Sequence, residues 1–200
     1  DTRNGGDPRL ELLQHFLVHG TLPWWWTQPL PLGVEPLLME LAVESPDALR
    51  SLLLAIGSSE SVRLRLVRQF SEPALRAVVR TLEPAEADFI LGYSDVLQEN
   101  QRQEPTVPAT LQEFRDAKWE FILRHLLVDR GSEFNRREFV RSTLAALAQR
   151  FRLPYETLLT QFLPSRSASV PVRHYPGFLR AITELWEELE PPPTESPALP

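Results

Sequence analysis

Residues 45–57 read SPDALRSLLLAIG, a segment that contains both a helix start signal and a helix stop signal. Ser45 offers a hydroxyl that can cap the first turn, Pro46 suits the first helical position, and Asp47 places a carboxylate at the positive end of the helix dipole. The leucines that follow keep helical spacing, and Gly57 ends the run. The segment therefore predicts one short amphipathic helix together with both of its ends.

A similar pattern returns further along the chain. Ser71-Glu72-Pro73 starts a helix that should reach Leu82, and residues 74–79 resemble residues 48–53. A repeat of this kind is typical of helix pairs stacked in an α-solenoid. Two copies do not establish a repeat, so an irregular bundle stays open as the alternative.

Helical spacing of apolar residues continues through most of the chain. Nineteen prolines and only eight glycines fall largely between the periodic segments, where prolines start and stop helices. We predict an all-α fold, an irregular helical bundle or a short α-solenoid of about ten helices. The expected helices cover residues 7–19, 34–42, 45–56, 59–70, 71–82, a longer one from 84 through 97, 110–130, 135–151, 154–163 and 177–190.

The polar stretch 98–108 contains two prolines and predicts a linker between two sub-bundles. We expect an N-terminal sub-bundle with a tryptophan-rich segment over residues 1–103 and a C-terminal sub-bundle over residues 108–190. A Ser-rich loop is expected at 164–171. Residues 191–200 are rich in proline and should form a disordered tail.

The charge balance excludes several classes of partner. The chain has 21 basic and 27 acidic residues, a net charge of −6, which argues against nucleic acid or an anionic membrane surface as the main partner. No apolar run approaches the roughly 20 residues that span a bilayer, so we expect no membrane insertion. The absence of cysteine excludes disulfides, thiolate nucleophiles and cysteine zinc sites, and it fits a reducing compartment.

Two patterns could hold a metal ion. His15 and His19 are four residues apart on a helix, a spacing that can place two ligands on one metal, but no third ligand completes the set nearby. Residues 129–135 alternate oxygen-bearing side chains as calcium loops do, but glycine comes third rather than sixth. A helix stop followed by a new cap explains that segment. We predict no metal and no cofactor.

Catalytic signatures are missing from the sequence as well. No phosphate-binding glycine loop, nucleophile elbow or HExxH helix is present. His125 lies in an apolar helical pattern and fits a hydrogen-bonded core histidine. We predict a non-enzymatic protein. The enzyme alternative would need His15, His19 or His125 to converge with Asp or Glu in a pocket.

The most unusual segment is GTLPWWW, residues 20–26. Pro23 biases the residue before it toward an extended shape, and extended backbone would turn Trp24 and Trp26 to one side and Trp25 to the other. Only one side can lie on the protein's own core, so at least one indole is a candidate anchor for a partner. The alternative is a hydrophobic staple with all three rings buried against the first helix.

Arginines make the middle helices basic, from Arg63 to Arg80. In an acidic protein such residues more often form a salt-bridged surface than a nucleic-acid groove, and a docking patch for an acidic protein is the other option. The candidate partner-binding residues are Gly20, Leu22, Pro23, Trp24, Trp25, Trp26, Arg63, Arg65 and Arg68.

Residues 15–25, HFLVHGTLPWW, resemble the xFLxxGxLPWW signature of tape-measure proteins of phage-tail-like contractile injection systems. A diffuse helical similarity continues through 63–70, a helix with Trp119, and a helix over 139–151. The resemblance implies a structural protein that helps to assemble the inner tube of the particle and to set its length. Its implied partners are inner-tube or baseplate-hub components, and its location would be the cytoplasm during assembly and then the assembled particle.

A molecular ruler must be extended, at about 1.5 Å per residue if it is helical. Prolines interrupt this chain repeatedly, so it should fold compactly. We therefore expect a globular terminal or docking module, with the length-setting portion elsewhere, or else a family member with a different role. The alternative is a generic α-helical adaptor or scaffold, which would present a concave groove unrelated to the tryptophans.

Overall fold

The computed structural model describes residues 7–27, 30, 33–129, 131, 133–163 and 176–189. These residues form ten α-helices and one π-helical turn and contain no strand, which confirms the all-α prediction. The expected Ser-rich loop and the tail 191–200 lie outside the described residues. The elements are α1 (Pro8–His19), α2 (Glu35–Glu44), α3 (Pro46–Ile56), α4 (Glu60–Gln69), α5 (Glu72–Leu82), α6 (Ala87–Gln103), α7 (Leu111–Arg124), η1 (His125–Asp129), α8 (Arg136–Phe151), α9 (Tyr155–Gln161) and α10 (Pro176–Leu189).

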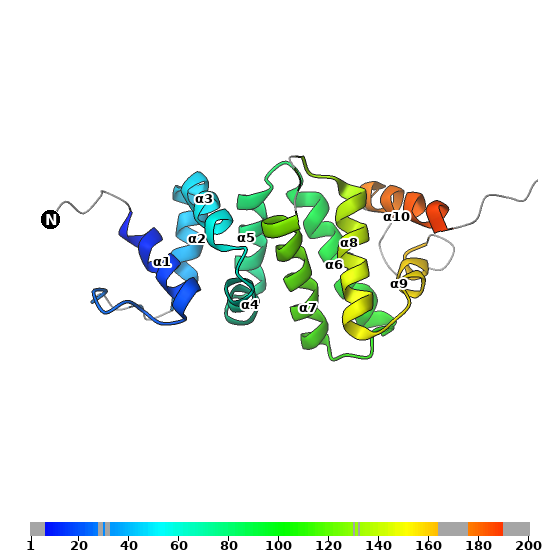
Figure 1. Ribbon diagram of the computed structural model, residues 1–200, viewed down its shortest axis with the longest axis horizontal. Coiled ribbons are helices and arrows are strands. Elements are labelled where there is room, and N and C mark those ends of the chain that lie inside the picture. The colour runs from blue at the N-terminus through cyan, green and yellow to red at the C-terminus, as the bar shows by residue number, and fades with distance from the viewer. Residues whose placement is uncertain are drawn as a thin grey trace, which may run out of the picture.

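The helices follow one another along the long axis of an elongated molecule, with α1 to α3 at one end and α9 and α10 at the other (Figure 1). Each helix packs mainly on near neighbours in the chain. Helix α1 contacts α2, α3 and α4, α5 contacts α2, α3 and α6, and α7 contacts α4, α6 and α8. This progressive stacking resembles that of a short α-solenoid, while α10 also packs back on α6 as helices do in an irregular bundle.

Local capping confirms several of the predicted helix starts. The Thr110 hydroxyl accepts from the Glu113 N–H at 3.2 Å while the Glu113 carboxylate accepts from the Thr110 N–H at 2.8 Å, so the capping box is present. Asn135 caps α8 by accepting from the Glu138 N–H at 3.0 Å. The Ser45 hydroxyl, by contrast, makes no capping bond, so that part of the prediction is wrong although the helix begins at the following proline as expected.

The stretch predicted as a linker is partly helical. Helix α6 continues to Gln103, which places residues 98–103 in the helix. Gln101 is buried, and its side-chain amide donates to the Val107 carbonyl at 2.8 Å and accepts from the Val107 N–H at 3.1 Å. The amide nitrogen and the amide oxygen of Gln101 both have backbone partners, so this polar side chain can be buried. The same two hydrogen bonds hold the following turn against α6.

Helices α3 and α5, which carry the repeated sequence, pack on each other. Leu49 and Leu75 occupy equivalent positions and are both fully buried. The arginine after each leucine reaches onward: Arg50 Nε donates to the last carbonyl of α5 at 3.0 Å, and Arg76 pairs with Asp95 of α6 at 2.7 Å. Equivalent residues thus bury the same face and connect each helix to another one.

Buried apolar side chains from α1 to α10 form one continuous core cluster. His125 lies within it at the start of η1, where the helix widens, and its Nδ1 is 2.9 Å from the Ser142 hydroxyl. Burial lowers the pKa of His125 below its ordinary value. The prediction of a hydrogen-bonded core histidine is therefore confirmed.

Candidate docking site

The tryptophan-bearing segment leaves the C-terminal end of α1 in a fixed direction. Gly20 ends the helix with a φ of 78°, and its N–H donates to the Phe16 carbonyl at 2.7 Å. A Cβ on Gly20 would lie 3.1 Å from the Arg65 guanidinium, which donates a hydrogen bond to the Leu17 carbonyl. Glycine is thus required here for its left-handed backbone and for space, and Arg65 of α4 holds the helix end in place.

Residues 23–26 form a turn, not an extended strand-like segment. The Trp26 N–H donates to the carbonyl of the buried Pro23 at 3.0 Å. Trp25 and Trp26 are partly buried against the core, with ring centroids 6.1 Å apart in an edge-to-face contact. The prediction that Trp24 and Trp26 share one side and Trp25 the other is therefore wrong, because a turn does not alternate its side chains as a pleat does.

The three indoles have separate environments. Trp24 is 91% exposed, whereas Trp25 and Trp26 are half-buried. Of the two alternatives left by the sequence, exposure of at least one indole holds at Trp24. The alternative, a hydrophobic staple with all three rings buried, is wrong for Trp24. Trp25 and Trp26 do pack against the core as that alternative predicts.

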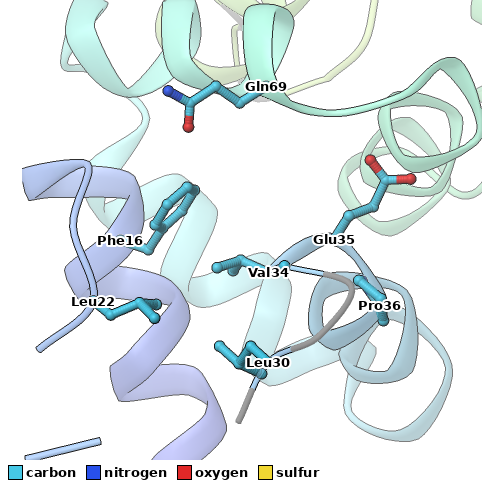
Figure 2. A pocket seen from close by; sticks show the side chains of 8 residues that line it. Phe16, Leu22, Leu30, Val34, Glu35, Pro36 and Gln69 are labelled. Atoms are coloured by element: carbon cyan, nitrogen blue, oxygen red, sulfur yellow. The ribbon is translucent and has the colours of Figure 1, made fainter.

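An open groove of about 580 Å³ lies beside this segment. Figure 2 shows its apolar side chains gathered on one side, with Gln69 across from them. The walls come from the end of α1, the irregular segment, the start of α2 and the end of α4: Phe16, Leu22, Leu30, Gly33, Val34, Glu35, Pro36 and Gln69. Such a groove offers mostly apolar contact to a ligand or to a partner side chain.

The acidic residue at the rim of the groove is already used by the fold. Glu35 of α2 accepts from the Ser71 N–H at 2.7 Å and from the Ser71 hydroxyl at 2.5 Å, so it caps the N-terminus of α5. Helix α5 begins where the Ser71-Glu72-Pro73 signal predicts, but the Ser71 hydroxyl makes no capping bond because the carboxylate from α2 takes that role. The groove therefore presents apolar walls and one amide at Gln69.

Exposed apolar side chains gather at this end of the molecule. Seven large apolar side chains are exposed in the described part of the chain, and three of them are Val18, Leu22 and Trp24. Single exposed apolar residues are ordinary on protein surfaces, whereas a cluster beside a groove is typical of an interaction site. Leu22, which is 47% exposed, belongs to both the cluster and the groove.

The three candidate arginines differ in what they contact. Arg63 is 7% exposed, and its Nη1 donates to the Gly57 and Ser58 carbonyls at 2.8 Å each, which closes the end of α3. Arg65 closes the end of α1 in the same way. Of the three, Arg68 alone is exposed. Only Arg65 lies against the segment of residues 20–26, at Gly20.

The two patterns that could hold a metal ion, His15 with His19 and residues 129–135, do not form a metal site within the described part of the chain. The rings of His15 and His19 lie with centroids 4.5 Å apart on α1. Across the described ranges, no group of three or more His, Asp or Glu side chains is arranged to hold a metal ion. Residues 130 and 132 of the calcium-like segment lie outside the described part. None of the described helices combines the length and apolar character needed to cross a membrane.

The groove has no signature in the sequence, although Leu22 is one of the predicted partner-binding residues. The groove needs Phe16 of α1, Val34 before α2 and Gln69 of α4 to meet, and these residues are far apart in sequence. Phe16 reads simply as part of the apolar stripe of α1. The one local signal is that Leu22 and Trp24 follow the end of a helix, where the core can no longer bury every apolar residue.

A protein-family model described as contractile injection system tape measure protein matches residues 1–193 of this 200-residue chain. No curated protein and no solved structure matches the chain. The family match includes the end of α1, the tryptophan turn and all ten described helices. The chain therefore belongs to the contractile injection system tape measure protein family.

Proposed function

We propose that this chain is a non-enzymatic assembly protein of a contractile injection particle, and that it docks on another particle component through Trp24 and the groove beside it. The observation that carries the proposal is the 91% exposure of Trp24, two residues after Leu22, which lines an apolar groove, in a chain of this family. Tryptophan is strongly enriched among the residues that dominate binding energy at protein interfaces.

The local structure supports docking at low entropic cost. Pro23 is buried and the following indoles pack on the core, so the turn that presents Trp24 is anchored on both sides. An anchor held in its bound conformation loses little freedom when it binds. Burial of an apolar side chain of this size stabilises a complex by about 2 to 3 kcal/mol, and aromatic contacts add to this.

The partner that we propose is a component of the inner tube or of the baseplate hub. In this role the chain would help to govern inner-tube assembly and length, first in the cytoplasm and then within the particle. The longest described α-helix, α6 with 17 residues, spans only about 26 Å at about 1.5 Å per residue, and α7 with its continuation η1 is only slightly longer. Stacked short helices suit a docking module better than an extended ruler.

Trp24→Ala tests the docking proposal in particle-producing cells. We expect the variant to lose co-purification with tube or hub components and to lower the yield of assembled particles. Leu111→Ala is the matched control, because Leu111 is also an exposed apolar residue but lies at the start of α7. Normal assembly with Trp24→Ala would refute docking through the indole, and a chain that never co-purifies with tube or hub would refute the assembly role.

A further inference from the structure

A second apolar groove lies between α2 and α5 and has a volume of about 430 Å³. We call it the α2–α5 groove. No residue of the tryptophan segment lines it, so it is separate from the docking site described above. Its lining residues are Met39, Ala42, Val43, Pro46, Pro73, Arg76, Ala77, Arg80 and Thr81.

Helix α2 is apolar on two faces, which is unusual for a surface helix. Its inner face buries Leu38 and Leu41 in the core, while its outer face carries Met39 and Val43 one turn apart. Val43 is 81% exposed, second only to Trp24 among the described large apolar side chains. The polar stripe of α2 is formed by Glu40 and Glu44, which lie toward Arg9 of α1, so the stripe with Met39 and Val43 is a second apolar face. An exposed apolar face of this kind has the composition of an interface.

Helix α5 supplies the other wall and its charge. Pro73 and Ala77 are four residues apart on the same face, and their small side chains leave room for a third helix against the pair. Arg76 and Arg80 also line the groove, whereas no carboxylate does. Arg76 is paired with Asp95, but Arg80 is exposed in the last turn of α5 and forms no ion pair within the described part of the chain.

We propose that the α2–α5 groove binds an acidic amphipathic helix of another protein. Apolar side chains spaced one turn apart on that helix would pack on Met39, Val43 and Ala77, and a flanking carboxylate would pair with Arg80. Two helices with an apolar floor and a charged rim are the usual receptor for such a helix. Opposite charge at the rim selects the partner and its orientation. This surface is independent of the Trp24 docking site.

The test uses the whole chain and two labelled synthetic peptides. Both peptides carry leucines at i, i+4 and i+7 on one helical face; one has glutamates beside the leucines and the other has lysines at those positions. Fluorescence anisotropy measures binding. We expect the glutamate peptide to bind about threefold or more tightly than the lysine peptide, which is the range of an exposed ion pair.

Two variants of the chain locate the site. Val43→Asp should weaken the glutamate peptide about tenfold or more, because it buries a carboxylate in the groove. Arg80→Glu should reverse the preference between the two peptides. Val128→Asp is the control, since Val128 is exposed on η1 away from the groove and its change should leave binding unaltered. Far-ultraviolet circular dichroism checks that each variant is folded.

Several results would overturn the proposal. These are no binding of the glutamate peptide, equal binding of both peptides, or unchanged binding by Val43→Asp. Sedimentation of the chain alone tests the competing occupant: a self-association that Val43→Asp abolishes would assign the groove to a second copy of this chain. A monomer that binds the glutamate peptide through Val43 and Arg80 would support the proposed partner.

Discussion

Trp24 and Trp119 show opposite uses of the same side chain. Trp119 lies in α7, is fully buried, and its Nε1 donates to Glu72 of α5 at 2.8 Å. Trp24 lies on a turn after α1 and is almost fully exposed. Helical spacing directs Trp119 into the junction with α5, whereas no periodic element directs Trp24 toward the core. The indole stabilises the fold in one region and remains available to a partner in the other.

The junction around Trp119 is held by polar as well as apolar contacts. Arg115 of α7 donates to the Val67 and Phe70 carbonyls at 3.0 and 3.2 Å, at the end of α4. It also lies 3.3 Å from the same Glu72 oxygen that accepts from Trp119. Because one carboxylate serves both side chains, loss of the indole would disturb helices α4, α5 and α7 together.

The largest expected effect is that of Trp119→Ala. Removing a buried indole should lower the free energy of unfolding by about 3 to 5 kcal/mol, because it leaves a cavity and an incompletely paired Glu72. Urea denaturation followed by circular dichroism measures the change. Trp119→Phe keeps most of the ring and should cost less. If Trp119→Ala lowered the free energy of unfolding by less than about 1 kcal/mol, the two indoles would not differ in their contribution to the fold.

Lys118, the neighbour of Trp119, should make the stability of this buried region depend on pH. It is the sole lysine of the chain and only 2% exposed; its ammonium is 3.3 Å from the Ser94 carbonyl and 5.2 Å from the centre of the Trp119 ring. Burial lowers the pKa of Lys118 to about 8, against an opposing effect of Glu72 and Asp95.

The pKa of Lys118 determines the sign of the pH effect. Between pH 8 and the ordinary pKa of 10.5, the unfolded chain holds a proton that the folded chain has released, so stability should rise with pH. At pH 7 Lys118 is mostly charged in both states, and Lys118→Met should stabilise the fold by up to about 3 kcal/mol, since it removes the cost of burying the charge. Unfolding curves at pH 7, 8 and 9 should show a rise that Lys118→Met lacks. Equal slopes in both proteins would contradict the expected effect.

Gly20→Ala tests how firmly the start of the tryptophan segment is held. A left-handed alanine should cost about 1 to 2 kcal/mol. The added Cβ would also press on the Arg65 guanidinium. Gly33→Ala is a close control, because Gly33 has a φ of 75° but no atom within 4 Å of its Cβ position. Thermal unfolding should show a larger loss for Gly20→Ala, and equal losses would mean that the Arg65 contact is unimportant.

The smallest expected effect is that of Trp24→Ala on stability. An exposed indole contributes little to the fold, so the free energy of unfolding should change by no more than about 0.5 kcal/mol. Trp25→Ala should cost more, because Trp25 packs on the core. Thermal unfolding of the two variants compares them directly. A large loss of unfolding free energy for Trp24→Ala would mean that Trp24 stabilises the fold as Trp119 does.

Most helices could be predicted because their signals are local. The repeat of apolar residues, a proline in the first turn and a capping box such as Thr110 with Glu113 act within a few residues. The exceptions follow from contacts across the fold. Gln101 belongs to a stretch that reads as a linker, yet it is buried in α6 because the backbone of Val107 satisfies its amide.

The candidate site was predictable in its sequence segment but not in its geometry. The segment of residues 20–26 was identifiable from its composition, but the sequence left open whether an indole is exposed or all three are buried. The role of Arg65 was not predictable, because its guanidinium reaches the Leu17 carbonyl, which is distant in sequence. Arg63 reaches the nearby Gly57 and Ser58 carbonyls, but its sequence pattern did not indicate this contact. Long side chains with several donors leave such choices open until the helices are packed.

The sequence by itself determined the helical class, the ends of most helices and the family signature at the end of α1. These depend on hydrogen bonds and apolar spacing within one or two turns. Only the tertiary structure decided that Trp24 is exposed while Trp25 and Trp26 are packed, and that grooves lie beside Leu22 and between α2 and α5. The direction of a side chain outside regular structure, and the space between helices, depend on residues distant in sequence that meet only after folding.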